Sequence, residues 1–463
     1  MFPQFTPQAL FVVFAWIPVV LYFFSRFPAQ RALIMSFVLG WLFLPLVTFP
    51  IPPFPPYTKM AATCYGILLA TLIFDADRFT SFKPGWLDLP MLIWCLCPIA
   101  SQVTTGGSPI SPTFNQIVTW GIPYFLGRIY LNNLEGLRQL AVGIFAGGVA
   151  YIPFCLVENA KGPILHQMVY GFQVFIDWSQ AKRYGGWRPV VFMTHGLMLG
   201  VWMMTGALIG IWLWRTGVLK KLWGIPVKWL AIALTISFIL CLSTGAYGYM
   251  VAGLIILFTA KWLRTALPLL VLICCLWIYI YQGTSGTFSS AQIIDTLTQV
   301  LPEERVDSLK FRFDNEELLG KQARRRVLFG WGDSGGNRIY DENGNDVSTT
   351  DSLWIIVFGT NGIVGIISWL SSLLLPPTAF TLFRYPASTW ANRKVAPAAV
   401  LAVALVLYVL DCFLNAMINP VFALISGGIS GLVLSEPATS PVKNARASVP
   451  RRSLAQQRQN QPN

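Results

Sequence analysis

Charged side chains are scarce in this chain, and their scarcity excludes several classes of protein. Asp, Glu, Lys and Arg make up 11% of the 463 residues, whereas 55% are hydrophobic and 14% are aromatic. Soluble domains usually contain about 25% charged residues, so this chain has too few charges to cover a surface that faces water. An ordinary soluble enzyme, a disordered protein and a small disulfide scaffold are therefore excluded.

Histidine is also scarce, and the cysteines are not spaced for metal binding. The sequence contains 2 histidines and 8 cysteines, and every cysteine falls in or beside an apolar segment. Cys95 and Cys97, and the adjacent pair Cys274 and Cys275, lack the spacing and the histidine partners of a zinc site. We expect free cysteines that pack as small apolar side chains, and we expect no metal and no other cofactor.

The apolar residues occur in long blocks. A helix needs about 17–25 such residues to cross the hydrocarbon core of a bilayer, and an outer-membrane barrel would instead show short alternating segments. The sequence therefore predicts an all-α fold, a polytopic transmembrane helical bundle with roughly 12–14 spans. The predicted blocks are 9–25, 32–49, 59–74, 89–103, 113–130, 138–157, 190–214, 229–243, 246–260, 265–282, 352–375, 396–412 and 418–434.

The distribution of Lys and Arg predicts the orientation of the bundle, because short cytoplasmic loops are rich in both. Basic residues gather in one set of alternate loops and in the polar tail, 437–463, which we expect to be disordered and cytoplasmic. Residues 1–436 would then form the transmembrane domain, with segments 158–189 and 283–351 outside. The basic loop residues are Arg26, Arg31, Arg78, Lys83, Arg128, Arg138, Arg215, Lys220, Lys221, Lys228, Lys261, Arg264, Arg384, Arg393 and Lys394.

These basic residues flank helices and do not gather on one folded face. We therefore expect them to anchor to anionic membrane lipids, and we expect no nucleic-acid partner.

The first outer segment, 158–189, ends in Arg188 and Pro189. Proline suits the first turn of a helix, which would place Arg188 at a helix mouth near the lipid headgroups. The arginine has two interpretations. It is either an interface anchor that reaches toward the headgroups, or a phosphate clamp that uses two parallel hydrogen bonds.

The second outer segment, 283–351, begins with a predicted helix near Glu303, where proline and acidic residues favour a helix start. This helix carries Arg305 and Arg312 on one face, although Arg312 could instead pair with Glu316 one turn later. A glycine-containing turn follows at 330–332.

Residues 337–347 form a predicted hairpin around Asn343-Gly344, a favoured tight turn. The acidic string Asp341–Asp346 has a weak likeness to a calcium loop. Its glycine is misplaced and no closing glutamate follows in the required frame.

Asp351 directly precedes a long apolar helix, where an aspartate is a good N-cap. Further along that helix, Gly362 and Gly365 would allow another element to approach closely.

Taken together, these motifs resemble those of the O-antigen ligase and polysaccharide polymerase superfamily of bacterial inner-membrane proteins. Members have a large periplasmic loop between late spans, and this chain shares the layout over its membrane part. The motifs that match in order and spacing are Arg312, Gly330-Trp331-Gly332, Asp351-Ser352 and Gly362-Ile-Val-Gly365, with Arg188 before an earlier span and Ser243-Thr244-Gly245 at a turn.

The resemblance implies transfer of a glycan from a polyprenyl diphosphate carrier to an acceptor hydroxyl, on a saccharide or lipid, at the periplasmic face. Arg188 and Arg312 would stabilise the diphosphate. The histidine that is often proposed as the family's base is replaced by Asp351, and a carboxylate can also accept the proton of a hydroxyl. Further substrate contacts are predicted at Arg305, Arg326, Trp331, Ser352 and His195.

Other functions are left open by the sequence. A lipid-linked oligosaccharide flippase or a polysaccharide transporter would be expected to carry ionisable residues near the midplane. No Lys or Arg is predicted there, and Asp411 falls near the outer end of its span. A non-catalytic membrane scaffold would need the spans but not the ordered motifs. The sequence does not separate a polymerase from a ligase.

Overall fold

The computed structural model describes residues 5–174, 181–287, 303–348 and 351–435, together with 295, 298 and 299. The predicted tail, 437–463, lies outside this range. Of the described residues, 72% are helical and few lie in strands, which confirms the prediction of an all-α, polytopic helical fold.

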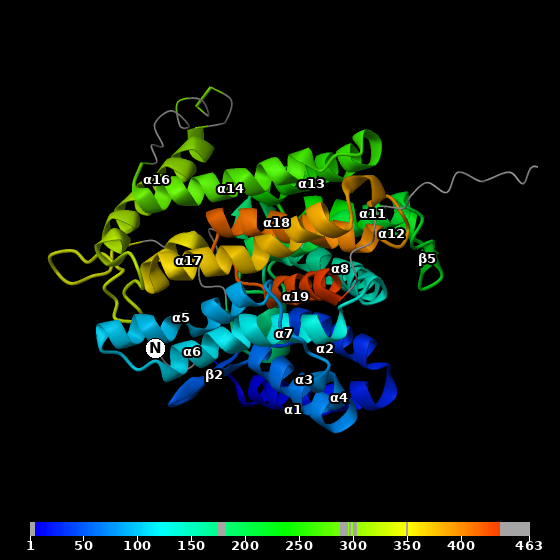
Figure 1. Ribbon diagram of the computed structural model, residues 1–463, viewed down its shortest axis with the longest axis horizontal. Coiled ribbons are helices and arrows are strands. Elements are labelled where there is room, and N and C mark those ends of the chain that lie inside the picture. The colour runs from blue at the N-terminus through cyan, green and yellow to red at the C-terminus, as the bar shows by residue number, and fades with distance from the viewer. Residues whose placement is uncertain are drawn as a thin grey trace, which may run out of the picture.

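The helices follow the predicted apolar blocks along the chain (Figure 1). They are α1 (Pro7–Arg26), α2 (Ala29–Phe43), α3 (Lys59–Phe74), α5 (Leu89–Thr105), α6 (Ile110–Gln116), η1 (Ile117–Gly121), α7 (Ile122–Tyr130), α8 (Leu134–Lys161), α11 (Gly196–Arg215), α12 (Val227–Ile239), α13 (Thr244–Leu263), α14 (Leu267–Ser285), α17 (Leu353–Ala379), α18 (Ala396–Leu414) and α19 (Pro420–Ser435).

Short elements connect these helices. Each pair of strands forms a two-stranded antiparallel hairpin. The strands are β1 (Thr48–Ile51), β2 (Phe54–Thr58), β3 (Lys182–Arg183), β4 (Gly186–Trp187), β5 (Lys221–Leu222) and β6 (Ile225–Pro226). The remaining helices are α4 (Asp77–Thr80), α9 (Leu165–Tyr170), α16 (Glu303–Ala323), η2 (Arg324–Arg326), η3 (Phe380–Arg384) and η4 (Ala387–Thr389).

In the described part of the chain, 7 helices are long and apolar enough to cross a membrane: α1, α8, α11, α13, α14, α17 with its extension η3, and α18. Five shorter apolar helices, α2, α3, α5, α12 and α19, match further predicted blocks. The remaining block, 113–130, is covered by α6, η1 and α7, which follow one another without a break.

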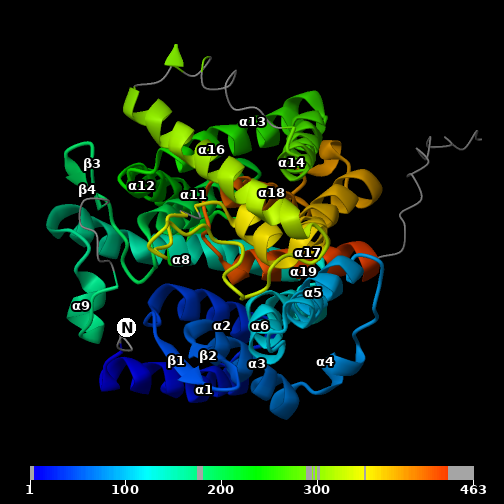
Figure 2. The same ribbon diagram turned by 90° about the vertical axis from the view of Figure 1, so that its left-hand side faces the viewer.

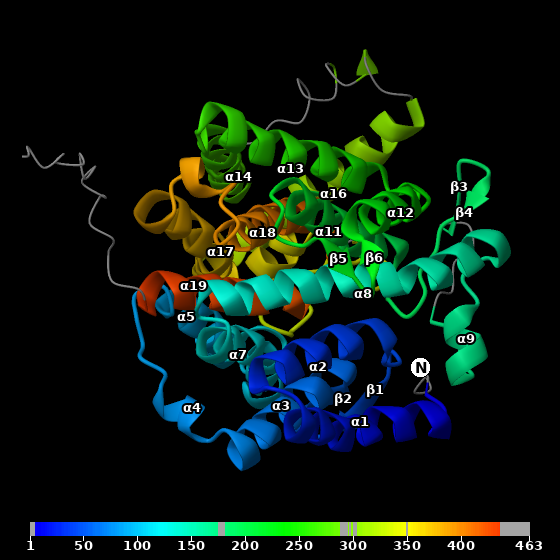
Figure 3. The ribbon, with the colours of Figure 1, turned by 90° about the vertical axis from the view of Figure 1, so that its right-hand side faces the viewer.

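Helices α11 and α18 form the centre of the bundle. In each, 89% of the most apolar stretch is buried, compared with 22% in α1 and α14, which lie at its edge. Helix α17 packs against α5 and α18, and α11 packs against α8 and α12. In Figure 3, α8 runs across the view while α17 is seen end-on, so the helices cross at steep angles.

The polar helix α16 lies outside the apolar bundle at one end of the molecule, near the start of α17, whereas β5 lies at the opposite end (Figure 1). Figure 2 shows α16 crossing in front of the ends of α14 and α17. It contacts both helices. The residues expected to act on a substrate are carried by α16, by η2 and the loop after it, by the start of α17 and by the segment before α11.

The start of α11 differs from the prediction. Pro189 was expected in its first turn, but the helix begins at Gly196. The carboxylate of Glu158, at the end of α8, accepts the N–H groups of Val190 and Val191 at 2.8 and 2.7 Å. Val191 also has a φ of 56°. This long-range contact holds the segment in a non-helical path.

Candidate functional site

Arg312 and Asp351 lie together, although a whole loop separates them in sequence. Arg312 Nε is 3.8 Å from Asp351 Oδ2, with 24% of the arginine side chain and 42% of the aspartate side chain exposed. Arg312 projects from the middle of α16, and Asp351 stands just before α17. Both side chains are therefore accessible to a ligand from the water side.

Glu316, one turn after Arg312, fixes the relative position of these two helices. Its side chain is 9% exposed and accepts hydrogen bonds from Tyr279 Oη (2.6 Å), from Trp354 Nε1 (3.1 Å) and from the Ser352 hydroxyl. Burial raises the pKa of Glu316, while these hydrogen bonds and the charge of Arg312 act in the opposite direction. Glu316 thus connects α16 to α14 and to the start of α17.

These contacts change two expectations for the start of α17. The N-cap is Ser352, whose side chain makes no capping hydrogen bond, and not Asp351. The carboxylate of Asp351 faces Arg312 instead. Among the described residues, Glu316 and Arg312 form no ion pair within 4 Å. The carboxylate oxygens of Glu316 instead accept hydrogen bonds from hydroxyl and indole groups.

Arg188 reaches the site through a tight hairpin. The turn between β3 and β4 consists of Tyr184 and Gly185, with φ of 51° and 77°, and positive φ at both positions is typical of a type I′ turn. The N–H of Arg188 then donates to the carbonyl of Ala181 at 2.7 Å. The hydroxyl of Tyr184 is 3.0 Å from that of Thr244, in the turn that the family resemblance had singled out.

The side chain of Arg188 is buried, with 1% exposed. It packs over Gly196, where an added Cβ would lie 2.5 Å from the arginine Cδ. Arg188 thus lies beside the first residue of α11, but its buried side chain does not extend to the surface as an interface anchor would. A buried guanidinium contributes its charge to the site, and Arg312 is the more accessible of the two arginines.

His195 connects the two outer segments. It is the N-cap of α11, and its Nδ1 accepts the N–H of Leu197 at 3.0 Å. Burial, followed by the positive charges of Arg188, Arg183 and Arg312, lowers the pKa of His195 to about 4. The imidazole is therefore neutral near pH 7, and because Nδ1 accepts, its proton is on Nε2. Arginines from both segments act on one ring.

A buried acid also lies near Arg312. Asp411, in α18, is 2% exposed, and its Oδ1 accepts a hydrogen bond from Asn415 Nδ2 at 2.6 Å. The charge of Arg312 reaches both Asp411 and Tyr249 of α13. The site therefore combines Arg312 of α16, Asp351 at the start of α17 and Asp411 of α18, with the phenol of Tyr249 in α13 beside them.

The glycine turn 330–332 packs against an interruption in α17. At Gly362 the helix has φ 65° and ψ −161°, and Gly330 has φ 68°. An added Cβ at Gly330 would lie 2.6 Å from the backbone carbon of Thr360. The backbone hydrogen bonds across this contact are Trp331 N–H to Gly359 O (2.9 Å), Gly332 N–H to Thr360 O (2.9 Å), Ile363 N–H to Val327 O (2.7 Å) and Val364 N–H to Leu328 O (3.3 Å).

The predicted contacts Arg326 and Trp331 belong to this loop contact and not to the Arg312–Asp351 pair. Arg326 Nη1 donates to the carbonyl of Thr104 in α5 at 3.2 Å, and its guanidinium lies 5.0 Å from the ring of Trp331. Trp331 Nε1 donates to the carbonyl of Gln322 at 3.2 Å. Arg305 lies in α16, but its side chain is outside the described part of the structure.

The predicted hairpin at 337–347 is present. Tyr340 pairs with Asp346, and Asp341 accepts the N–H groups of Asn343 and Asn345. Among the described residues, no group of three or more His, Cys, Asp or Glu side chains is placed to hold a metal ion. The cysteines are free, and the prediction of unpaired thiols is confirmed.

No family model matches the chain, and no curated protein is similar to it. The resemblance to the ligase and polymerase superfamily rests on the motifs alone.

Two site residues carried no functional prediction. Glu316 was noted only as a partner for Arg312 on its own helix, and Asp411 only for its depth in the membrane. The available indication was their position: Glu316 lies one turn from a motif arginine, and Asp411 is an acid inside an apolar block. Neither position reveals which other helix the side chain faces.

Proposed function

We propose that this chain is a membrane glycan polymerase or ligase that transfers a saccharide from a polyprenyl diphosphate carrier to an acceptor hydroxyl. The observation that carries the proposal is the Arg312–Asp351 pair at 3.8 Å, with buried Arg188 packed on Gly196, directly after His195. The reaction would take place on the periplasmic face of a bacterial inner membrane, the side assigned to both outer segments by the basic-residue distribution.

Arg312 and Asp351 are exposed enough to contact a substrate. In the proposed reaction, the bond between the sugar and the diphosphate oxygen breaks while the acceptor oxygen bonds to the anomeric carbon. Asp351 accepts the acceptor's proton, and the guanidinium of Arg312 stabilises the negative charge on the leaving diphosphate. Substrate binding would draw Arg312 away from Asp351 toward the phosphates, which frees the carboxylate to act as a base.

Arg188 and His195 would act around this pair. Buried Arg188 supplies positive charge in a region of low dielectric, where its field is stronger than in water. His195, neutral and protonated on Nε2, supplies a hydrogen-bond donor. These two groups favour an anionic leaving group without adding a competing base.

A transporter is the second candidate, because α17 is interrupted at Gly362 and broken helices line the binding sites of many transporters. The loop contact argues against it. Backbone groups on both sides of the interruption form hydrogen bonds with residues 327–332. Because these groups already have partners, they are not free to coordinate an ion.

The test uses the full chain in nanodiscs with a polyprenyl-diphosphate-linked oligosaccharide and a matching acceptor. The proposal predicts release of polyprenyl diphosphate with growth of the acceptor. Arg312→Ala should abolish the release. Lys310→Ala, an exposed cation on the same helix, is the control and should leave it unchanged. Uptake of the donor into vesicles without release of diphosphate would instead favour the transporter.

A further inference from the structure

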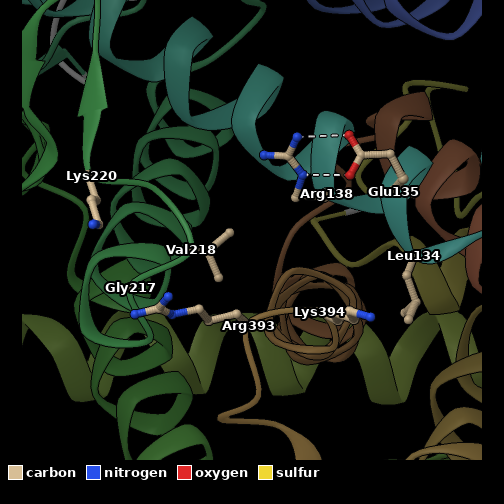
Figure 4. A pocket seen from close by; sticks show the side chains of 8 residues that line it. All are labelled: Leu134, Glu135, Arg138, Gly217, Val218, Lys220, Arg393 and Lys394. Carbon is tan, nitrogen blue, oxygen red and sulfur yellow. Dashed lines mark hydrogen bonds and ion pairs between the residues drawn. The ribbon is translucent and has the colours of Figure 1, made fainter.

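A second polar site lies at the other end of the bundle, near β5. A cavity of about 610 Å³ opens between the start of α8, the turn after α11 and the loop before α18 (Figure 4). Its lining residues are Leu134, Glu135, Arg138, Gly217, Val218, Lys220, Arg393 and Lys394. All of them are remote in sequence from the Arg312–Asp351 pair.

The charge of this cavity is strongly positive and largely uncompensated. Arg138 is neutralised by Glu135, which binds it through two hydrogen bonds of 2.7 and 2.8 Å. Lys220, Arg393 and Lys394 are exposed, and the ion pairs between described residues include none of the three. Three cations therefore line one cavity without an acidic partner.

Gly217 allows one of these cations to approach the wall of the cavity. Its φ is 67°, and an added Cβ would lie 3.2 Å from Arg393 Nη2. In Figure 4, Arg393 points toward Gly217, while Lys394 points to the other side, toward Leu134. The two side chains thus bracket the cavity from one loop.

Two long helices also begin here. Helix α8 begins at Leu134, in the lining itself, and α18 begins at Ala396, directly after the loop that carries Arg393 and Lys394. The first turn of a helix carries the positive end of its dipole, although here the N–H of Gly136 is capped by Asn133 Oδ1 and that of Ala396 is bonded to the carbonyl of Asn392. These partial charges add to those of the three cations and favour a bound anion.

We propose that this cavity binds a phosphate group, most simply the headgroup phosphate of an anionic lipid, at the face of the bundle opposite the candidate site. The cavity lies at the ends of three apolar helices, α8, α11 and α18, where headgroups are found. Unpaired cations between membrane helices are the chemistry that recognises such headgroups. The same chemistry would accept a soluble phosphate, so the experiment must separate the two sources. The inference does not depend on the proposed transfer reaction.

The experiment measures binding to the full chain in detergent by native mass spectrometry, with phosphatidylglycerol, cardiolipin or phosphatidylcholine as the probe. The pocket variant carries Lys220→Gln, Arg393→Gln and Lys394→Gln. The control variant also loses three exposed or half-exposed cations from the same set of loops, through Lys83→Gln, Lys228→Gln and Lys261→Gln. The pocket variant should bind the two anionic lipids at least roughly 30-fold more weakly. The control variant should lose far less binding, because its three cations are spread over separate loops.

Gly217→Asn is a milder variant that keeps every charge. Asparagine tolerates positive φ, but its side chain would displace Arg393, and anionic lipid binding should weaken. A second arm adds inorganic phosphate and follows thermal unfolding. Stabilisation by phosphate in the wild type but not in the pocket variant, without any change in lipid binding, would assign the phosphate to a soluble source. Equal losses in the pocket and control variants, or no loss in either, would overturn the proposal.

Discussion

Glu316 offers the sharpest test of how the candidate site is built. Its buried carboxylate accepts hydrogen bonds from Tyr279, Ser352 and Trp354. Glu316→Ala would remove all three interactions, leave their donors without this acceptor, and open a small cavity. An unsatisfied buried donor costs about 1–3 kcal/mol, and a new cavity adds to that cost. We therefore expect a loss of about 3–5 kcal/mol in the free energy of unfolding.

Glu316→Gln would be milder. The amide keeps one acceptor oxygen and removes a charge whose burial is costly, as the raised pKa of Glu316 indicates. The expected loss is about 1 kcal/mol.

Glu317→Ala is the matched control on the next residue. Its side chain is 59% exposed and pairs with Lys321 one turn away at 2.8 Å. Such a pair contributes at most about 0.5 kcal/mol.

Thermal unfolding of the three variants in detergent would rank them, with tryptophan fluorescence as the probe because Trp354 contacts the carboxylate. The reasoning predicts that Glu316→Ala is the least stable, followed by Glu316→Gln and then Glu317→Ala. If Glu316→Ala were as stable as Glu317→Ala, Glu316 would not hold α16 against α17.

Three further predictions follow from the site and its supports. The pKa of His195 is lowered to about 4 from its usual 6.5. As the pH falls, this histidine is therefore protonated in the unfolded chain at a higher pH than in the folded chain. Stability should decline between pH 6.5 and 4, by about 3 kcal/mol at pH 4, and His195→Asn should reduce the decline measured by thermal unfolding. In the same assay, Gly330→Ala should lower the free energy of unfolding by about 1–3 kcal/mol more than Gly344→Ala does. Gly344 has a similar φ but open space around it. Arg188→Leu, which removes a buried charge, should lower the rate of glycan transfer far more than substrate affinity, and an equal effect on both would contradict its proposed role.

The order of the apolar helices along the chain could be predicted from the sequence because it depends on local patterns. Blocks such as 396–412 are long and apolar, and a helix is the structure that satisfies their backbone groups inside lipid. The errors arose where distant residues decide the local structure. The start of α11 moved from 190 to 196 because Glu158 binds the backbone of Val190 and Val191, and no local pattern contains that contact.

The candidate site could be predicted only in part. Arg312 and Asp351 were chosen from motif order, and the structure brings them together. The burial of Arg188 and the separate position of Arg326 and Trp331 depend on how the hairpin and the glycine loop pack on other helices. Spacing along the chain carries no information about these contacts, because several folds of a loop satisfy the same spacing.

The measurement that tests the central claim most directly is glycan transfer by Asp351 variants in nanodiscs. Asparagine has nearly the same size and shape as aspartate, but its amide cannot act as a base, whereas the imidazole of histidine can. The account predicts that Asp351→Asn lowers the transfer rate by about 100-fold or more, while Asp351→His retains measurable transfer and both proteins unfold at similar temperatures. Wild-type transfer rates in Asp351→Asn would contradict the account.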